Sequence, residues 1–188
     1  MPLAAETDAV GAPPVAVIGN GPVALYAVLQ FARHGLAPVL VERDHAEADI
    51  GAKASLRAQI SAELVDRRPL TLSGRMATSV WGSLEGGFNV ETDTAETITG
   101  TAVMVVQNPD GSDAITGLPR IADYRSSETD VPGIFVLSDA PTGDAPAPVI
   151  EALFLEALRA VKATADRVAE QRATLAPSPH TSQTHPTA

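Results

Sequence analysis

The segment from Val15 to Asp44 reads VAVIGNGPVALYAVLQFARHGLAPVLVERD, and its pattern decides the fold. The β-branched run from Pro14 to Ile18 predicts a short strand, and apolar residues from Pro22 to Arg33 recur at the spacing of a helix. Gly35 is a typical residue for the end of that helix, and the apolar run from Pro38 to Val41 predicts a second strand. A strand, a helix and a second strand in this order form a βαβ unit, which predicts parallel strands with a right-handed crossover.

A GxGxxA turn lies between the first strand and the helix, and its residues are Gly19, Asn20, Gly21, Pro22, Val23 and Ala24. We interpret it as a dinucleotide-type phosphate-binding turn, because it directly follows a strand and opens a helix. The first glycine allows the tight turn, the second lets a pyrophosphate approach the backbone, and the alanine keeps the helix close to the sheet. The N–H groups at the helix start then favour an anion. The alternative is a glycine-rich turn without a ligand. The strand before the turn and the strand after the helix disfavour this alternative.

The acidic residue Glu42 closes the second strand, 18 residues beyond Ala24. In a dinucleotide-binding fold, a carboxylate at this place accepts hydrogen bonds from the adenosine ribose and repels the extra phosphate of NADP. Arg43 follows directly and slightly weakens that exclusion. Glu42 and Arg43 therefore join the turn as predicted cofactor-binding residues, although Glu42 taken alone is also consistent with a solvated carboxylate at a strand end.

Two further helices are expected in the rest of the chain. Residues 51–68 read as an amphipathic helix, and the chain from Val149 to Val168 reads as a second, C-terminal helix. The inner face of the first is expected at Leu56, Ile60 and Leu64, and that of the second at Val149, Leu153, Leu158 and Val161. We expect one domain over residues 14–170, between a flexible leader at 1–13 and a disordered tail at 171–188.

Short apolar runs predict the remaining strands, at Leu70–Leu72, Ala77–Trp81, Phe88–Val90, Ile98, Ala102–Val106 and Gly133–Leu137. Gly86-Gly87 predicts a hairpin turn, which makes a small antiparallel β-element. Ala102–Val106 has no polar interruption and is typical of a strand covered on both faces. Residues 107–130 are expected mostly as loop.

Composition and charge limit the classes of function. The chain has 188 residues and a formal net charge of −10, which repels phosphate backbones, so we expect no nucleic-acid binding. We see no secretory signal and no apolar run that spans a bilayer, so we expect no membrane association and a cytoplasmic location. The sequence has no cysteine, which excludes dithiol redox chemistry by this chain, and its four histidines lack metal-ligand spacing, so we expect no metal site.

Two stretches resemble the FAD-binding domain of thioredoxin-reductase-like flavoproteins, members of the pyridine nucleotide-disulfide oxidoreductase family. The first is Val15–Asp44, and the second is Thr129–Asp139 (TDVPGIFVLSD), which is similar to that family's carboxy-terminal signature. The resemblance implies an α/β fold: a single FAD-type Rossmann-like domain with a parallel sheet, a βαβ start, a small antiparallel β-element and a C-terminal helix. It also implies that Asp139 contacts the ribityl-phosphate region of FAD, with Ser138 at a position where the family has glycine.

The sequence also departs from that family. Val106, Gln107 and Asn108 stand where the family has an Ala-Thr-Gly turn. About 20 residues join Asn108 to Thr129, too few for the family's nicotinamide-binding domain. These departures and the missing cysteines point to a relative without its own nicotinamide domain or dithiol centre.

Three hypotheses of function follow, and the sequence names no catalytic residue for any of them. The first is an FAD-binding, oxidoreductase-like flavoprotein, which needs a small-molecule substrate or a partner reductase to supply electrons. The second is a non-redox descendant, with flavin lost or only structural, that acts as a cyclase or isomerase on a small apolar biosynthetic intermediate. The third is an NAD-binding module. The first two make the chain an enzyme, and a homodimer is expected to cover the open cleft edge.

Overall fold

The computed structural model describes residues 14–43, 52–107, 115–123, 127–138 and 147–175. Its helices and strands, in chain order, are β1 (Pro14–Ile18), α1 (Gly21–Arg33), β2 (Ala37–Glu42), α2 (Ala52–Leu64), β3 (Leu70–Ser73), β4 (Ala77–Ser83), β5 (Gly87–Thr92), β6 (Thr97–Gly100), β7 (Ala102–Gln107), β8 (Ile121–Asp123), β9 (Glu128–Thr129), β10 (Ile134–Ser138) and α3 (Ala147–Leu175).

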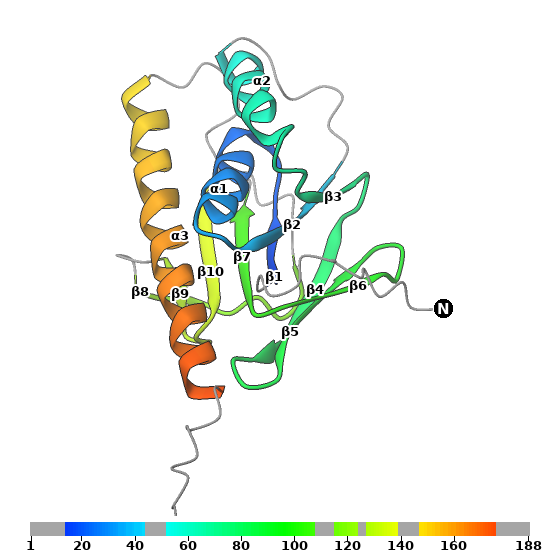
Figure 1. Ribbon diagram of the computed structural model, residues 1–188. Helices are drawn as coiled ribbons and strands as arrows, with labels where there is room; N and C mark the ends of the chain where they lie inside the picture. The colour runs from blue at the N-terminus through cyan, green and yellow to red at the C-terminus, as the bar shows by residue number, and fades with distance from the viewer. Residues whose placement is uncertain (1–13, 44–51, 108–114, 124–126, 139–146, 176–188) are drawn as a thin grey trace, which may run out of the picture.

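A mixed, mostly parallel sheet forms the centre of the molecule, in the order β3-β2-β1-β7-β10-β9-β8. The first five of these strands pair in parallel, and β9 and β8 are added antiparallel at one edge. Strands β4, β5 and β6 form a separate antiparallel sheet. The expected α/β fold, with its βαβ start and small antiparallel element, is confirmed (Figure 1).

The central sheet is covered on both faces, because its strands send alternate side chains to opposite sides. Val15 and Val17 of β1 belong to the cluster that packs under the helices, together with Met104 of β7. Ala16 and Ile18 belong to a second cluster, which packs against the small sheet. All apolar residues of β7 are buried, as its uninterrupted pattern predicted.

The helices α1 and α3 pack against each other on one face of the sheet, and α2 packs against α1 (Figure 1). Tyr26 of α1 stacks on Phe154 of α3, with ring centroids 4.6 Å apart. The expected inner face of α2 is confirmed, since Ile60 and Leu64 are buried and Leu56 packs against the same cluster.

The expected inner stripe of α3 is partly wrong. Val149 and Leu158 are 38% and 37% exposed, whereas Val161 is buried as expected. The buried face is made mostly of small side chains, namely Ala157, Ala160, Val161, Thr164 and Val168. Small side chains allow a helix to approach its neighbours closely, so Val149 and Leu158 are not needed on the buried face.

Three element boundaries also differ from expectation. Residues 107–130 contain the two short strands β8 and β9, although we expected mostly loop. The helix α3 continues to Leu175, beyond residue 170, where the domain was expected to end. The helix α2 ends at Leu64, and the backbone N–H groups of Arg67 and Arg68 both donate to the Leu64 carbonyl in the turn that follows.

Candidate functional site

Gly19 makes the turn that leads from β1 into α1, and its backbone φ of 144° lies in a region that suits glycine. Its N–H donates to the carbonyl of Val41 at 3.1 Å. A Cβ added to Gly19 would lie 2.6 Å from the carbonyl oxygen of Val106 and 2.8 Å from the Val106 Cβ. The end of β7 therefore requires a glycine here, in addition to the turn itself.

The first turn of α1 has the form expected of an anion-binding helix start. Asn20 is the N-cap residue with an extended backbone, and Gly21 has a φ of 81°. The first backbone N–H groups of a helix have no partner within the helix, and they attract negative charge. No acidic residue lies in the first turn of α1 to compete with an anion. Pro22 and Val23 continue the helix, and Ala24 is fully buried in the core under it, as the motif predicted.

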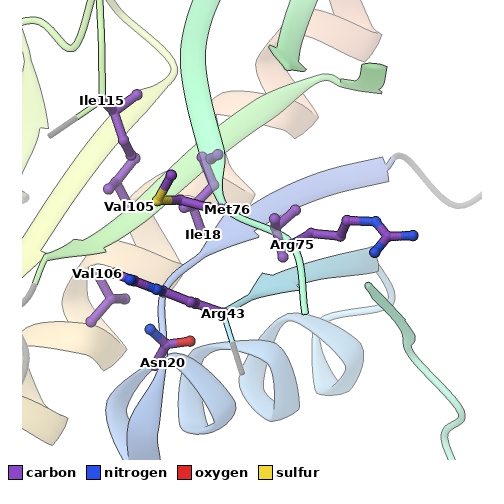
Figure 2. Close-up of a pocket in the computed structure, with 11 residues that line it drawn as sticks. Ile18, Asn20, Arg43, Arg75, Met76, Val105, Val106 and Ile115 are labelled. Carbon is purple, nitrogen blue, oxygen red and sulfur yellow. The ribbon is translucent and has the colours of Figure 1, made fainter. Parts of the chain in front are cut away.

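A small pocket, partly open to solvent, lies at the carboxyl ends of β1, β2 and β7 (Figure 2). Its lining residues are Ile18, Gly19, Asn20, Val41, Arg43, Arg75, Met76, Ala77, Val105, Val106 and Ile115. From β1 the chain proceeds to β2 and β3 on one side, while β7 leads to β10 on the other, so the pocket lies where the strand order reverses. Such switch points are where doubly wound folds bind ligands.

The segment before β4 forms one wall of this pocket, and sequence reasoning missed it. The backbone N–H of Arg75 donates to the Glu42 carbonyl at 3.1 Å, which fastens the segment to the end of β2. Met76 and Ala77 follow and reach the pocket, and Ile115 reaches it from the chain after β7. No local pattern marks these residues as site residues, because only the packing of the small sheet on the central sheet brings them there.

The structure places Glu42 outside the pocket lining, against our expectation for a ribose ligand. Arg57 of α2 donates to its Oε2 at 2.9 Å, and Ser73 of β3 donates to its Oε1 at 2.9 Å. The Glu42 side chain is 14% exposed. Both carboxylate oxygens thus tie β2 to its neighbouring elements.

Two arginines line the pocket, and they differ in direction. Arg43 extends from the end of β2 into the pocket, whereas the Arg75 guanidinium points away from it (Figure 2). Arg75 instead donates from Nε to Glu96 at 2.8 Å. This hydrogen bond raises the pKa of Arg75 and lowers the pKa of Glu96. Within the described lining of the pocket there is no acidic residue.

Of the two residues expected near the flavin, the structure describes one. Ser138 ends β10 and pairs in register with Gln107 at the end of β7, next to the switch point. Asp139 lies outside the described residues.

The described part of the chain contains no cluster of side chains that could hold a metal ion. None of its helices combines the length and apolar character that a membrane crossing requires.

Solved structures with the same fold include two thioredoxin reductases. The atypical thioredoxin reductase TRi from Desulfovibrio vulgaris Hildenborough aligns with a TM-score of 0.62 at 12% identity, covering 85% of this chain and 99% of that chain. TrxB of Bacillus anthracis, named as a thioredoxin reductase, aligns with a TM-score of 0.60 at 9% identity, covering 85% of this chain and 99% of that one. The protein HlmI aligns with a TM-score of 0.65 at 13% identity, covering 87% of this chain and 95% of that one.

Searches by sequence give no such relatives. No protein-family model matches the chain, and no curated protein matches it either. At identities of 9% to 13%, the structural likeness shows the fold alone: this chain has the α/β fold of these thioredoxin reductases and of HlmI.

Proposed function

We propose that this protein is an FAD-binding flavoprotein that holds the adenosine diphosphate half of FAD in the pocket between β1 and β7. The observation that carries the proposal is the position of this pocket, directly above the Gly19–Gly21 turn and at the point where the strand order reverses. The fold shared with thioredoxin-reductase-like proteins supports it.

The residues present fit the adenosine diphosphate group. The start of α1 offers backbone N–H groups to the diphosphate, and the positive φ of Gly21 keeps a Cβ-free residue beside them. Val41, Met76 and Val105 give apolar walls against which an adenine ring can pack.

The chemistry would come from the flavin, which transfers hydride or single electrons when it is bound. This chain would bind and orient the cofactor, with Ser138 and Asp139 as the candidates for the ribityl-phosphate side. Because the sequence has no cysteine, no dithiol of this chain accepts the electrons. We therefore propose that a small-molecule substrate or a partner reductase exchanges electrons with the flavin, and that two copies of the chain form a homodimer.

A second function has one observation in its favour. Glu42 does not line the pocket, and apart from the two arginines and Asn20 the lining is apolar or glycine. Such a pocket also suits a small apolar molecule, as expected for a cyclase or isomerase that has lost flavin. The third hypothesis, an NAD-binding module, shares this pocket with the first, because NAD and FAD have the same adenosine diphosphate half.

Visible absorption of the natively purified protein, before and after addition of FAD and desalting, tests the proposal. We expect flavin bands retained at about one per chain and lost in Gly21→Asp, whose carboxylate repels the diphosphate. The matched control is Gly35→Asp, which adds the same charge at a positive φ of 73° beyond the other end of α1 and should retain FAD. A wild-type protein that melts cooperatively but takes up no FAD contradicts the proposal and favours the second function.

A further inference from the structure

Glu42, the last residue of β2, and Arg43, which follows it, face opposite sides of the central sheet. Along β2, Leu40 packs in the cluster under the helices and Val41 packs in the cluster under the small sheet. Because side chains alternate along a strand, Glu42 follows Leu40 to the helix side, and Arg43 follows Val41 to the pocket side. The contact of Glu42 with Arg57 of α2 and the place of Arg43 in the pocket lining agree with this alternation.

On the helix side, the Glu42 carboxylate connects three elements, namely β2, α2 and β3. Its two oxygens accept hydrogen bonds from Arg57 and Ser73, each at 2.9 Å, and so connect β2 to α2 and to β3. To reach a ligand, this partly buried carboxylate would have to give up its ion pair with Arg57 and its hydrogen bond from Ser73. The carboxylate expected to select the ribose is therefore held in a structural role.

On the pocket side, Arg43 places a positive charge near the start of α1. Figure 2 shows its side chain crossing the pocket, with the guanidinium on the side of Val106 and Asn20. Asn20 is the N-cap of α1, so the guanidinium and the positive end of the helix dipole face the same pocket. The described lining adds no acidic side chain, although the whole chain carries a net charge of −10.

We infer that Arg43 binds the diphosphate of the ligand, and that Glu42 does not contact the ribose. A guanidinium carries five N–H donors in a planar fork that matches pairs of phosphate oxygens. A local positive charge is needed here, because an otherwise acidic protein repels a diphosphate. The inference rests on the proposed function insofar as the diphosphate belongs to FAD.

Isothermal titration calorimetry with FAD, ADP and adenosine tests this role. We expect Arg43→Gln to weaken FAD and ADP about tenfold, since it removes a charge-assisted hydrogen bond to phosphate, and to leave adenosine unchanged. Affinity of the wild type for ADP should fall as salt is raised, and this dependence should be weaker in Arg43→Gln. Glu42→Gln should retain its affinity for ADP and adenosine. The control is Arg159→Gln, an equal loss of charge at an exposed position of α3.

The outcomes separate this inference from the proposed function. Suppose that the wild type binds FAD. If Arg43→Gln then keeps its affinity for ADP, or loses affinity for adenosine and ADP equally, the proposed role of Arg43 is wrong, while FAD binding stands. If ADP binds through Arg43 but FAD does not bind, the role of Arg43 stands and the flavoprotein proposal is wrong. A wild type that binds neither nucleotide overturns both. Cooperative melting of each variant shows that it is folded.

Discussion

The two glycines of the turn serve different purposes, although they are two residues apart. Gly19 is required by its neighbour, because a Cβ there would meet the Val106 carbonyl oxygen at 2.6 Å. Gly21 has a φ of 81° at the helix start, where a free approach to the backbone matters for an anion. The sequence predicted a glycine turn at this place, and the structure adds that part of the reason for its first glycine lies in β7, far away in the chain.

We predict that Gly19→Ala lowers the free energy of unfolding by roughly 3 kcal/mol, from the strained φ together with the clash against Val106. Gly35→Ala is the matched control, since Gly35 has a φ of 73° with no atom within 4 Å of the added Cβ. We expect it to cost about 1 kcal/mol, from backbone strain alone. Urea unfolding measures both variants. Equal losses in the two would show that β7 does not constrain Gly19.

Between elements, an ion pair connects α3 to the strand edge, in addition to the hydrogen bond from Ser127 to Glu156 of α3. Arg167 donates from Nε and Nη2 to the two carboxylate oxygens of Glu128 in β9, at 3.2 and 3.1 Å. Glu128 also accepts from the backbone N–H of Gly133 at 3.0 Å, just before β10. The hydrogen bond to Glu128 raises the pKa of Arg167 above its ordinary value. This one carboxylate therefore joins β9, the turn before β10 and α3.

We predict that Glu128→Gln lowers the free energy of unfolding by about 1 kcal/mol, because it removes a paired charge that water screens only in part. Asp166→Asn is the control, because it breaks an exposed ion pair with Lys162. The Lys162 side chain is 70% exposed and the Asp166 side chain 62%, so the change in the free energy of unfolding should be less than about 0.5 kcal/mol. Thermal melts at neutral pH compare the two. A loss in Asp166→Asn as large as that in Glu128→Gln would contradict the special role of Glu128.

The sequence predicted elements better than faces. The periodicity of Val15–Asp44 gave the βαβ start, and the unbroken apolar run of β7 gave a strand buried on both sides. In α3 apolar spacing predicted Val149 and Leu158 on the inner face, but both are partly exposed, whereas Ala157 and Ala160 are fully buried. Apolar spacing therefore predicts a helix, but the largest apolar residues need not lie on its buried face.

At the scale of the whole molecule, the pocket is made by segments that are distant in the chain. The turn after β1, the end of β2, the start of β4 and the end of β7 all contribute to it. The sequence indicated the first two through the glycine motif and Glu42-Arg43. From the sequence, we predicted that the Glu42 carboxylate binds the adenosine ribose. The alternation of side chains along β2 does not by itself tell which face of the sheet carries the pocket. Met76 and Ala77 were missed, because they enter only through the packing of the small sheet.

Binding of an adenosine diphosphate group in the pocket between β1 and β7 can be tested by amide chemical-shift mapping, with ¹⁵N-labelled protein and increasing ADP. We expect saturable changes that are largest at Gly19, Gly21, Arg43, Ala77 and Val105, with the amides of the small-sheet strand β5 unaffected. No saturable change, or changes concentrated away from the pocket lining, would contradict it.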